Sequence, residues 1–121
     1  IKSFISKEDY PYLVKDADIG LVCLSSNNKT PFVPGKSLGY MAAGKPVLAF
    51  LNKESDGFAL IEKGKCGYAA TSENISLAAE LVKQVYSQKN ELNEIGENGF
   101  RYVNENLALD IVLKKIEELI F

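Results

Sequence analysis

The residues best suited to chemistry are VPGKS, at positions 33–37, where a Pro-Gly pair precedes a short amphipathic run. Apolar residues recur at helical spacing over residues 36–43, which predicts a helix there. The first turn of a helix has unpaired backbone N–H groups and the positive end of the helix dipole, so it can bind an anion such as a diphosphate. Gly35 would allow close approach to the backbone, Lys36 adds a positive charge, and Ser37 adds a hydroxyl donor.

The same residues also have a purely structural interpretation. Pro-Gly before a helix is ordinary turn chemistry. The sequence contains neither the glycine-rich phosphate loop that ends in Gly-Lys-Ser/Thr nor the Gly-x-Gly-x-x-Gly dinucleotide pattern. Taken alone, the motif favours the structural interpretation and leaves the phosphate site as the second hypothesis.

Apolar runs alternate with amphipathic segments along the chain. Strands are predicted at residues 1–5, 19–24, 47–51 and 66–70, with 19–24 as a central strand because both of its faces are apolar. Helices are predicted at about residues 9–16, 36–43, 56–63, 75–86, 91–104 and 109–119. This order predicts an α/β fold, with a parallel sheet, helices on both faces and extra C-terminal helices. Ligands of such sheets bind beyond the carboxyl ends of the strands, which is where residues 25–35 form a long loop.

Composition excludes several classes of function. The 121 residues are 46% hydrophobic and 25% charged, which suits one domain with one core. Fourteen basic and 16 acidic residues give a net charge of −2, so nucleic acid is not an expected partner. The chain has no histidine, and Cys23 and Cys66 are far apart, so no metal site is predicted. Both thiols are expected to be buried and reduced, as in a cytoplasmic protein, although a disulfide between them stays open.

Longer stretches resemble a known family. PGKSLGYMAAGKPVLA, following ADIGLVCL, resembles the C-terminal domain of the group 1, or family 4, glycosyltransferases, and FISKEDYPYLVKDADIGL and KGKCGYAATSENISLAAELV extend the likeness over nearly all of the chain. The resemblance implies the Rossmann-like, donor-binding half of a two-domain GT-B enzyme. Because the chain opens on isoleucine without a signal-peptide pattern, we expect it to be part of a longer protein whose N-terminal domain binds the acceptor.

The resemblance has one clear departure. Members of the family carry two glutamates separated by seven residues, and the matching positions here are Pro31 and Gly39. In the family one glutamate binds the ribose hydroxyls and the other reaches the donor sugar. Recognition of both must rest on other groups here, which indicates a divergent subfamily.

Site residues follow from the resemblance position by position. The residues expected to face the diphosphate and ribose are Val33, Pro34, Gly35, Lys36, Ser37 and Leu38. The end of the first strand would hold the base through backbone groups, at Phe4, Ile5 and Ser6, with core packing as an equal alternative for the two apolar residues. Sugar contacts are an option for Asn27, Asn28 and Thr30, although surface-loop polarity explains them more simply.

The function implied is sugar transfer, with retention of configuration, from a UDP- or GDP-linked donor to a glycan or lipid-linked acceptor, as in the synthesis of surface polysaccharide. No metal or other cofactor and no catalytic acid or base is predicted, and the chain alone is expected to be inactive. We expect the full-length protein to be cytoplasmic, with the inner face of the membrane as one location and peripheral association as the mode of contact. The alternative is a non-catalytic α/β module that binds a nucleotide or a partner.

Overall fold

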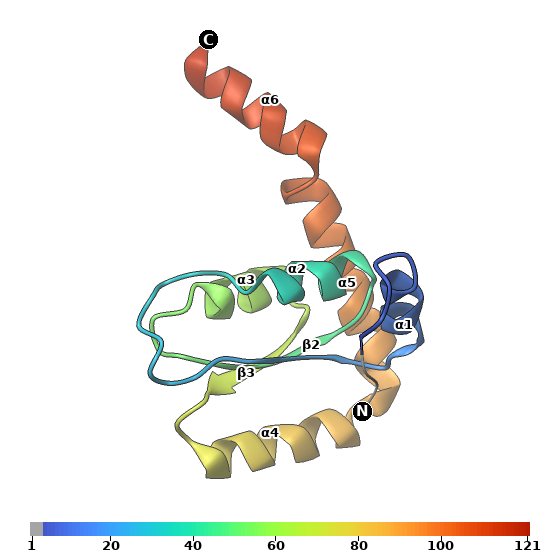
Figure 1. The fold of residues 1–121 in the computed structure, drawn as a ribbon, viewed down its shortest axis with the longest axis vertical. Coiled ribbons are helices and arrows are strands. Elements are labelled where there is room, and N and C mark those ends of the chain that lie inside the picture. Colours follow the sequence, from blue (N-terminus) through green and yellow to red (C-terminus); the bar gives the residue numbers. More distant parts are fainter. Residues whose placement is uncertain (1–3) are drawn as a thin grey trace.

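The fold is built on a parallel sheet that carries helices on both faces. A computed structural model describes residues 4–121. The strands are β1 (Gly20–Cys23), β2 (Val47–Leu51) and β3 (Gly67–Thr71), in the spatial order β1-β2-β3 with both pairs parallel (Figure 1). The predicted α/β, Rossmann-like class is therefore confirmed.

Two helices cover one face of this sheet and one helix covers the other. The helices α2 (Gly35–Ala42) and α3 (Gly57–Gly64) lie on one side, and α4 (Ile75–Ser87) lies on the opposite side (Figure 1). A short helix α1 (Tyr10–Asp16) precedes β1, and a 3-10 turn η1 (Lys89–Glu91) leads into α5 (Leu92–Asn106) and α6 (Leu109–Ile120). For β1 to β3 and α1 to α6, the bounds match the sequence prediction to within two residues at every end.

The main core lies between the sheet and the layer formed by α2, α3 and α5. Alternate residues of β2 point into it, and Met41 of α2 is fully buried among them. Cys66, just before β3, belongs to the same cluster, and burial raises the pKa of its thiol to about 11. Tyr40 lies over β1, where a Cβ atom added to Gly20 would fall 2.2 Å from its ring. Tyr40 and Met41, which lie at helical spacing, therefore have structural roles in the core.

The glycines of α5 do not act as weak points in the way their helix propensity suggests. They are buried, because α5 packs closely across α2 and the end of α3. A Cβ atom at Gly96 would lie 2.1 Å from the backbone oxygen of Gly44, and one at Gly99 would lie 2.9 Å from Cβ of Cys66. Phe100, which was expected to point inward, is half exposed instead. Gly96 and Gly99 thus form the closest contacts of α5, where larger side chains would not fit, and Tyr102 and Val103 of the same helix also pack against the core.

The predicted central position of β1 is wrong. β1 is an edge strand within the described sheet, and β2 is the central one. Leu21 is 53% exposed and Cys23 is also exposed, because α4 lies against β3 and leaves this face of β1 uncovered. The expectation of two buried thiols therefore holds for Cys66 and fails for Cys23, and both cysteines are free.

The opening of the chain also differs from expectation. Residues 1–3 of the predicted first strand lie outside the described residues, and Phe4, Ile5 and Ser6 form no strand. Ser6 instead belongs to the turn before α1, where its hydroxyl accepts from the backbone N–H of Asp9 and donates to the Asp9 carboxylate. Pro11 lies in the first turn of α1, as its missing N–H predicts.

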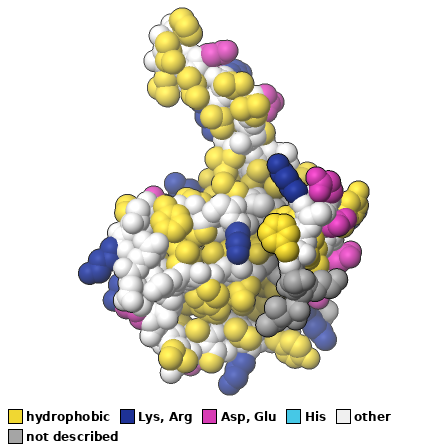
Figure 2. All heavy atoms as spheres, viewed as in Figure 1, with side chains coloured by type: hydrophobic (Ala, Val, Ile, Leu, Met, Phe, Trp, Pro, Cys, Tyr) yellow, Lys and Arg dark blue, Asp and Glu magenta, His cyan; other side chains and the backbone are white. Residues whose placement is uncertain are grey.

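The last helix projects away from the body. α6 packs only against the end of α5, and none of its residues is buried (Figure 1). Its apolar side chains are therefore exposed, as Figure 2 shows along the projecting arm. Within residues 4–121, no helix combines the length and apolar character needed to cross a membrane.

Candidate functional site

The start of α2 lies at the carboxyl edge of the sheet. β1 ends at Cys23, the chain passes through a loop at residues 24–34, and α2 then returns toward the start of β2 (Figure 1). The position is fixed by packing, because a Cβ atom on Gly57 would lie 2.9 Å from the side chain of Leu51 and 3.2 Å from the ring of Pro34. The beginnings of α2 and α3 are thus adjacent, next to the tip of β2.

The first turn of α2 is open to solvent and has no side-chain cap. Pro34 is the N-cap residue and contributes only its backbone oxygen, which accepts from the N–H of Ser37 at 2.9 Å. Gly35 and Lys36 are exposed, and no acceptor within residues 4–121 bonds to their backbone N–H groups. A Cβ atom on Gly35 would meet no other atom within 4 Å. The two amides therefore lie unpaired at the positive end of the helix dipole.

The other residues predicted around this turn have different environments. Val33 is 36% exposed, Pro34 is buried, and Leu38 is packed partly against the core. Ser37 is 1% exposed, and no described group bonds to its hydroxyl oxygen. Of the six residues expected to face a diphosphate, Gly35 and Lys36 present both exposed surface and unpaired backbone donors.

The loop before α2 is tied to the turn that follows β2. The side-chain amide of Asn52 donates to the backbone oxygen of Asn28, and the hydroxyl of Ser55 donates to the backbone oxygen of Phe32 at 2.9 Å. The Ser55 hydroxyl also accepts from the N–H of Gly57 at 3.1 Å. The Ser55 hydroxyl therefore pairs the first N–H of α3. Asp56 occupies the N-cap position of this helix and makes no side-chain cap bond.

The polar residues expected near a sugar form turns within this loop. Asn28 accepts from the N–H of Thr30 at 2.9 Å through its side chain, and the N–H of Asn27 donates to the hydroxyl of Ser25 at 3.2 Å. Asn27 and Thr30 are exposed, and Asn28 is half-buried. The structural explanation therefore accounts for Asn28, whereas the side chains of Asn27 and Thr30 stay free for other contacts.

The residues expected to hold a base form a separate surface. Phe4, Ile5 and Ser6 line a shallow pocket with Asp9, Leu13 and Asp16, beside α1. Phe4 is fully exposed. None of the three residues shares a pocket or a hydrogen bond with the start of α2.

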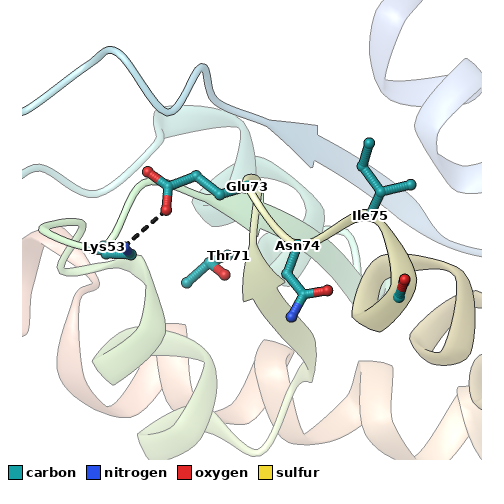
Figure 3. A pocket seen from close by; sticks show the side chains of 6 residues that line it. Lys53, Thr71, Glu73, Asn74 and Ile75 are labelled. Atoms are coloured by element: carbon teal, nitrogen blue, oxygen red, sulfur yellow. Dashed lines mark ion pairs between the residues drawn. The ribbon is translucent and has the colours of Figure 1, made fainter.

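A second polar cluster at the carboxyl edge was not predicted. Lys53 follows β2 and Glu73 follows β3, and their side chains point toward one another and form an ion pair of 2.8 Å (Figure 3). The hydrogen bond to Glu73 raises the pKa of Lys53. With the first residues of α4 they line a hollow of about 520 Å³. Both residues come two positions after neighbouring parallel strands, and this spacing could have indicated that they meet.

The start of α4 in this cluster is capped by its own sequence. Asn74 is the N-cap residue, and its side chain accepts from the N–H of Leu77 at 2.9 Å. No group of three or more potential metal-ligating residues occurs in the part of the chain that the structure describes. Comparisons of the chain with protein-family models, curated proteins and solved structures found no match.

Proposed function

We propose that the chain binds the diphosphate of a UDP- or GDP-linked sugar at the start of α2, as the donor-binding part of a retaining glycosyltransferase. The observation that carries this proposal is the open first turn of α2, with the unpaired N–H groups of Gly35 and Lys36 at the carboxyl edge of a parallel sheet. The resemblance of residues 17–24 and 34–49 to the family adds the substrate class.

Electrostatics support an anionic ligand at this position. Two free backbone N–H groups, the positive end of a helix dipole and the ammonium group of Lys36 all favour negative charge. The described residues place no carboxylate in the first turn of α2. In sugar transfer, negative charge develops on the departing nucleoside diphosphate, and donors fixed in advance stabilise it without reorganisation. Gly35 and Lys36 would serve the leaving group, and acid–base chemistry is not assigned to any residue of this chain.

Titration calorimetry with UDP, GDP, UDP-glucose and GDP-mannose tests the proposal. We expect one nucleotide series to bind with a dissociation constant in the millimolar range or tighter. Gly35→Val should abolish this binding because its branched side chain would occupy open space beside the Gly35 N–H. The fold should tolerate this change, since the Cβ position meets no atom within 4 Å. Lys36→Ala should also abolish detectable binding.

The matched control is Lys45→Ala, because Lys45 lies just beyond the opposite end of the same helix. Its removal changes the net charge by the same amount as Lys36→Ala and should leave binding unchanged. Equal losses in both variants would mean that only the overall charge matters. The proposal is refuted if none of the four compounds binds.

A further inference from the structure

Asn52 is a buried polar residue at the same edge of the sheet. It follows Leu51, the last residue of β2, and is 2% exposed. Its side-chain nitrogen donates to the backbone oxygen of Asn28, which lies in the loop before α2. Its side-chain oxygen, Oδ1, accepts from no group within residues 4–121. One half of this carboxamide is therefore used by the fold, and the other half is not.

An unpaired amide oxygen in a buried position is unfavourable, and native proteins contain few of them. Ser55, which is also buried and lies three residues later, shows the usual outcome. Its hydroxyl donates to Phe32 and accepts from Gly57, so both of its capacities are filled. An apolar side chain of similar shape at position 52 would fill the same space without an unpaired oxygen. The bond to Asn28 thus accounts for the nitrogen of the Asn52 carboxamide, and no described contact accounts for its oxygen.

The loop at residues 24–34 contacts the buried side chain of Asn52 through the backbone oxygen of Asn28. Two side chains from the turn after β2 hold it, Asn52 through Asn28 and Ser55 through Phe32. The end of the loop is the open first turn of α2, where Pro34 packs on the turn after β2. A ligand that displaces Asn28 from Asn52 would therefore meet the carboxamide next to the proposed diphosphate site.

We infer that Asn52 binds a hydroxyl group of the sugar nucleotide, with Oδ1 accepting the hydrogen bond once the loop has moved off the side chain. This inference rests on the proposed function. A carboxamide oxygen requires a donor, and a diphosphate carries none at neutral pH. The two groups bonded directly to the diphosphate are the ribose and the hexose, which both carry hydroxyl donors, whereas the N–H donors of the base lie beyond the ribose. The partner of Oδ1 is therefore a ribose or hexose hydroxyl.

Nuclear magnetic resonance of the ¹⁵N-labelled chain tests this inference without altering the fold. The backbone N–H of Gly35 reports on the diphosphate site, and the side-chain NH₂ of Asn52 reports on the carboxamide. We expect both signals to shift together when the nucleotide that binds in calorimetry is added. A shift at Asn52 with UDP or GDP alone places the partner on the nucleoside, and a shift only with UDP-glucose or GDP-mannose identifies the hexose.

Two other outcomes would overturn the inference in distinguishable ways. A shift of Gly35 without a shift of Asn52 refutes the role of Asn52 and leaves the proposed function intact. No shift at either position with any of the four compounds refutes both.

A pair of variants separates ligand contact from loop positioning. Asn52→Leu removes the acceptor and the tie to Asn28, whereas Ser55→Ala removes the other tie, to Phe32, together with the bond from the Gly57 N–H at the start of α3. We expect Asn52→Leu to weaken binding about tenfold, the size of one lost hydrogen bond, and Ser55→Ala to weaken it less than twofold. Equal weakening by the two variants would mean that Asn52 acts only by holding the loop. Should Asn52→Leu fail to fold, the titration of the unaltered chain decides.

Discussion

Two helices, α2 and α4, begin at the carboxyl edge of the sheet, and their first turns are built in opposite ways. α4 starts with Asn74, whose side chain accepts from the N–H of Leu77 and so satisfies one of the free donors of the first turn. α2 starts with Pro34, which has no side-chain acceptor, and leaves the N–H groups of Gly35 and Lys36 unpaired. The sequence thus provides a capping side chain at the start of α4 and none at the start of α2.

Local charge follows the same division. The residue before the α4 cap is Glu73, paired with Lys53 from the neighbouring turn (Figure 3). The first turn of α2 contains Lys36 and no carboxylate. A helix start that binds an external anion needs free donors and no competing negative charge nearby. The fold alone therefore does not distinguish the starts of α2 and α4, whereas capping and local charge do.

Exchanging the charges of the two starts should have the largest effect. We expect Lys36→Glu, like Lys36→Ala, to abolish detectable binding of the preferred nucleotide diphosphate, because a favourable charge is replaced by a repulsive one. Glu73→Lys should create no second site, since Asn74 already occupies a donor of α4. Calorimetry at low and high salt measures both. Tight binding by Lys36→Glu, or a second binding event in Glu73→Lys, would contradict the comparison.

Adding a cap to α2 should close its open start. Pro34 already has the extended backbone of an N-cap residue, with φ −62° and ψ 121°. A serine there can accept from the first-turn N–H groups, so Pro34→Ser should weaken nucleotide binding about tenfold. Pro34→Ala loses the same ring packing against Gly57 without adding an acceptor, and should weaken binding less. The prediction fails if the alanine variant binds as weakly as the serine variant.

Removing the cap of α4 should change stability and leave binding unaffected. Asn74→Ala deletes the acceptor of the Leu77 N–H, and loss of such a cap costs about 1 kcal/mol. Urea denaturation followed by circular dichroism measures this loss. Nucleotide affinity should stay within twofold of the unaltered chain. A loss of affinity in this variant would show that the start of α4 also contributes to the site.

The sequence predicts the elements of this fold well because their periodicity is local. Apolar runs predicted β2 and β3, and helical spacing predicted α2. Gly44, just after α2, has a positive φ of 68°, as is usual for a glycine that follows a helix. The preference for glycine after a helix does not hold at the end of α3, where Lys65 adopts the left-handed conformation. The tie of Cys66 to the preceding turn, through its N–H and Ile61, holds that turn in place.

What could not be predicted depends on contacts between distant segments. The edge position of β1 depends on strand order, which an apolar run such as IGLVCL does not encode. Helix propensity counts Gly96 as unfavourable in α5. In the structure it allows α5 to approach the backbone of Gly44, which is far away in sequence. For the candidate site, the motif at Gly35 and Lys36 was sufficient to locate an open helix start. The ties from Asn52 and Ser55 to the loop required the structure.

The ion pair beside α4 should have the smallest effect of all. Lys53 and Glu73 lie at 2.8 Å, but their side chains are 65% and 48% exposed, so water and salt screen the attraction. Because the pair raises the pKa of Lys53, the contribution of the lysine is present at neutral pH and is lost as the pH rises through the lysine titration. We expect Lys53→Ala to leave the melting temperature at pH 7 unchanged within error, and nucleotide binding unchanged as well. A clear drop in affinity would show that Lys53 supplements Lys36, and that a ligand spans both helix starts rather than one.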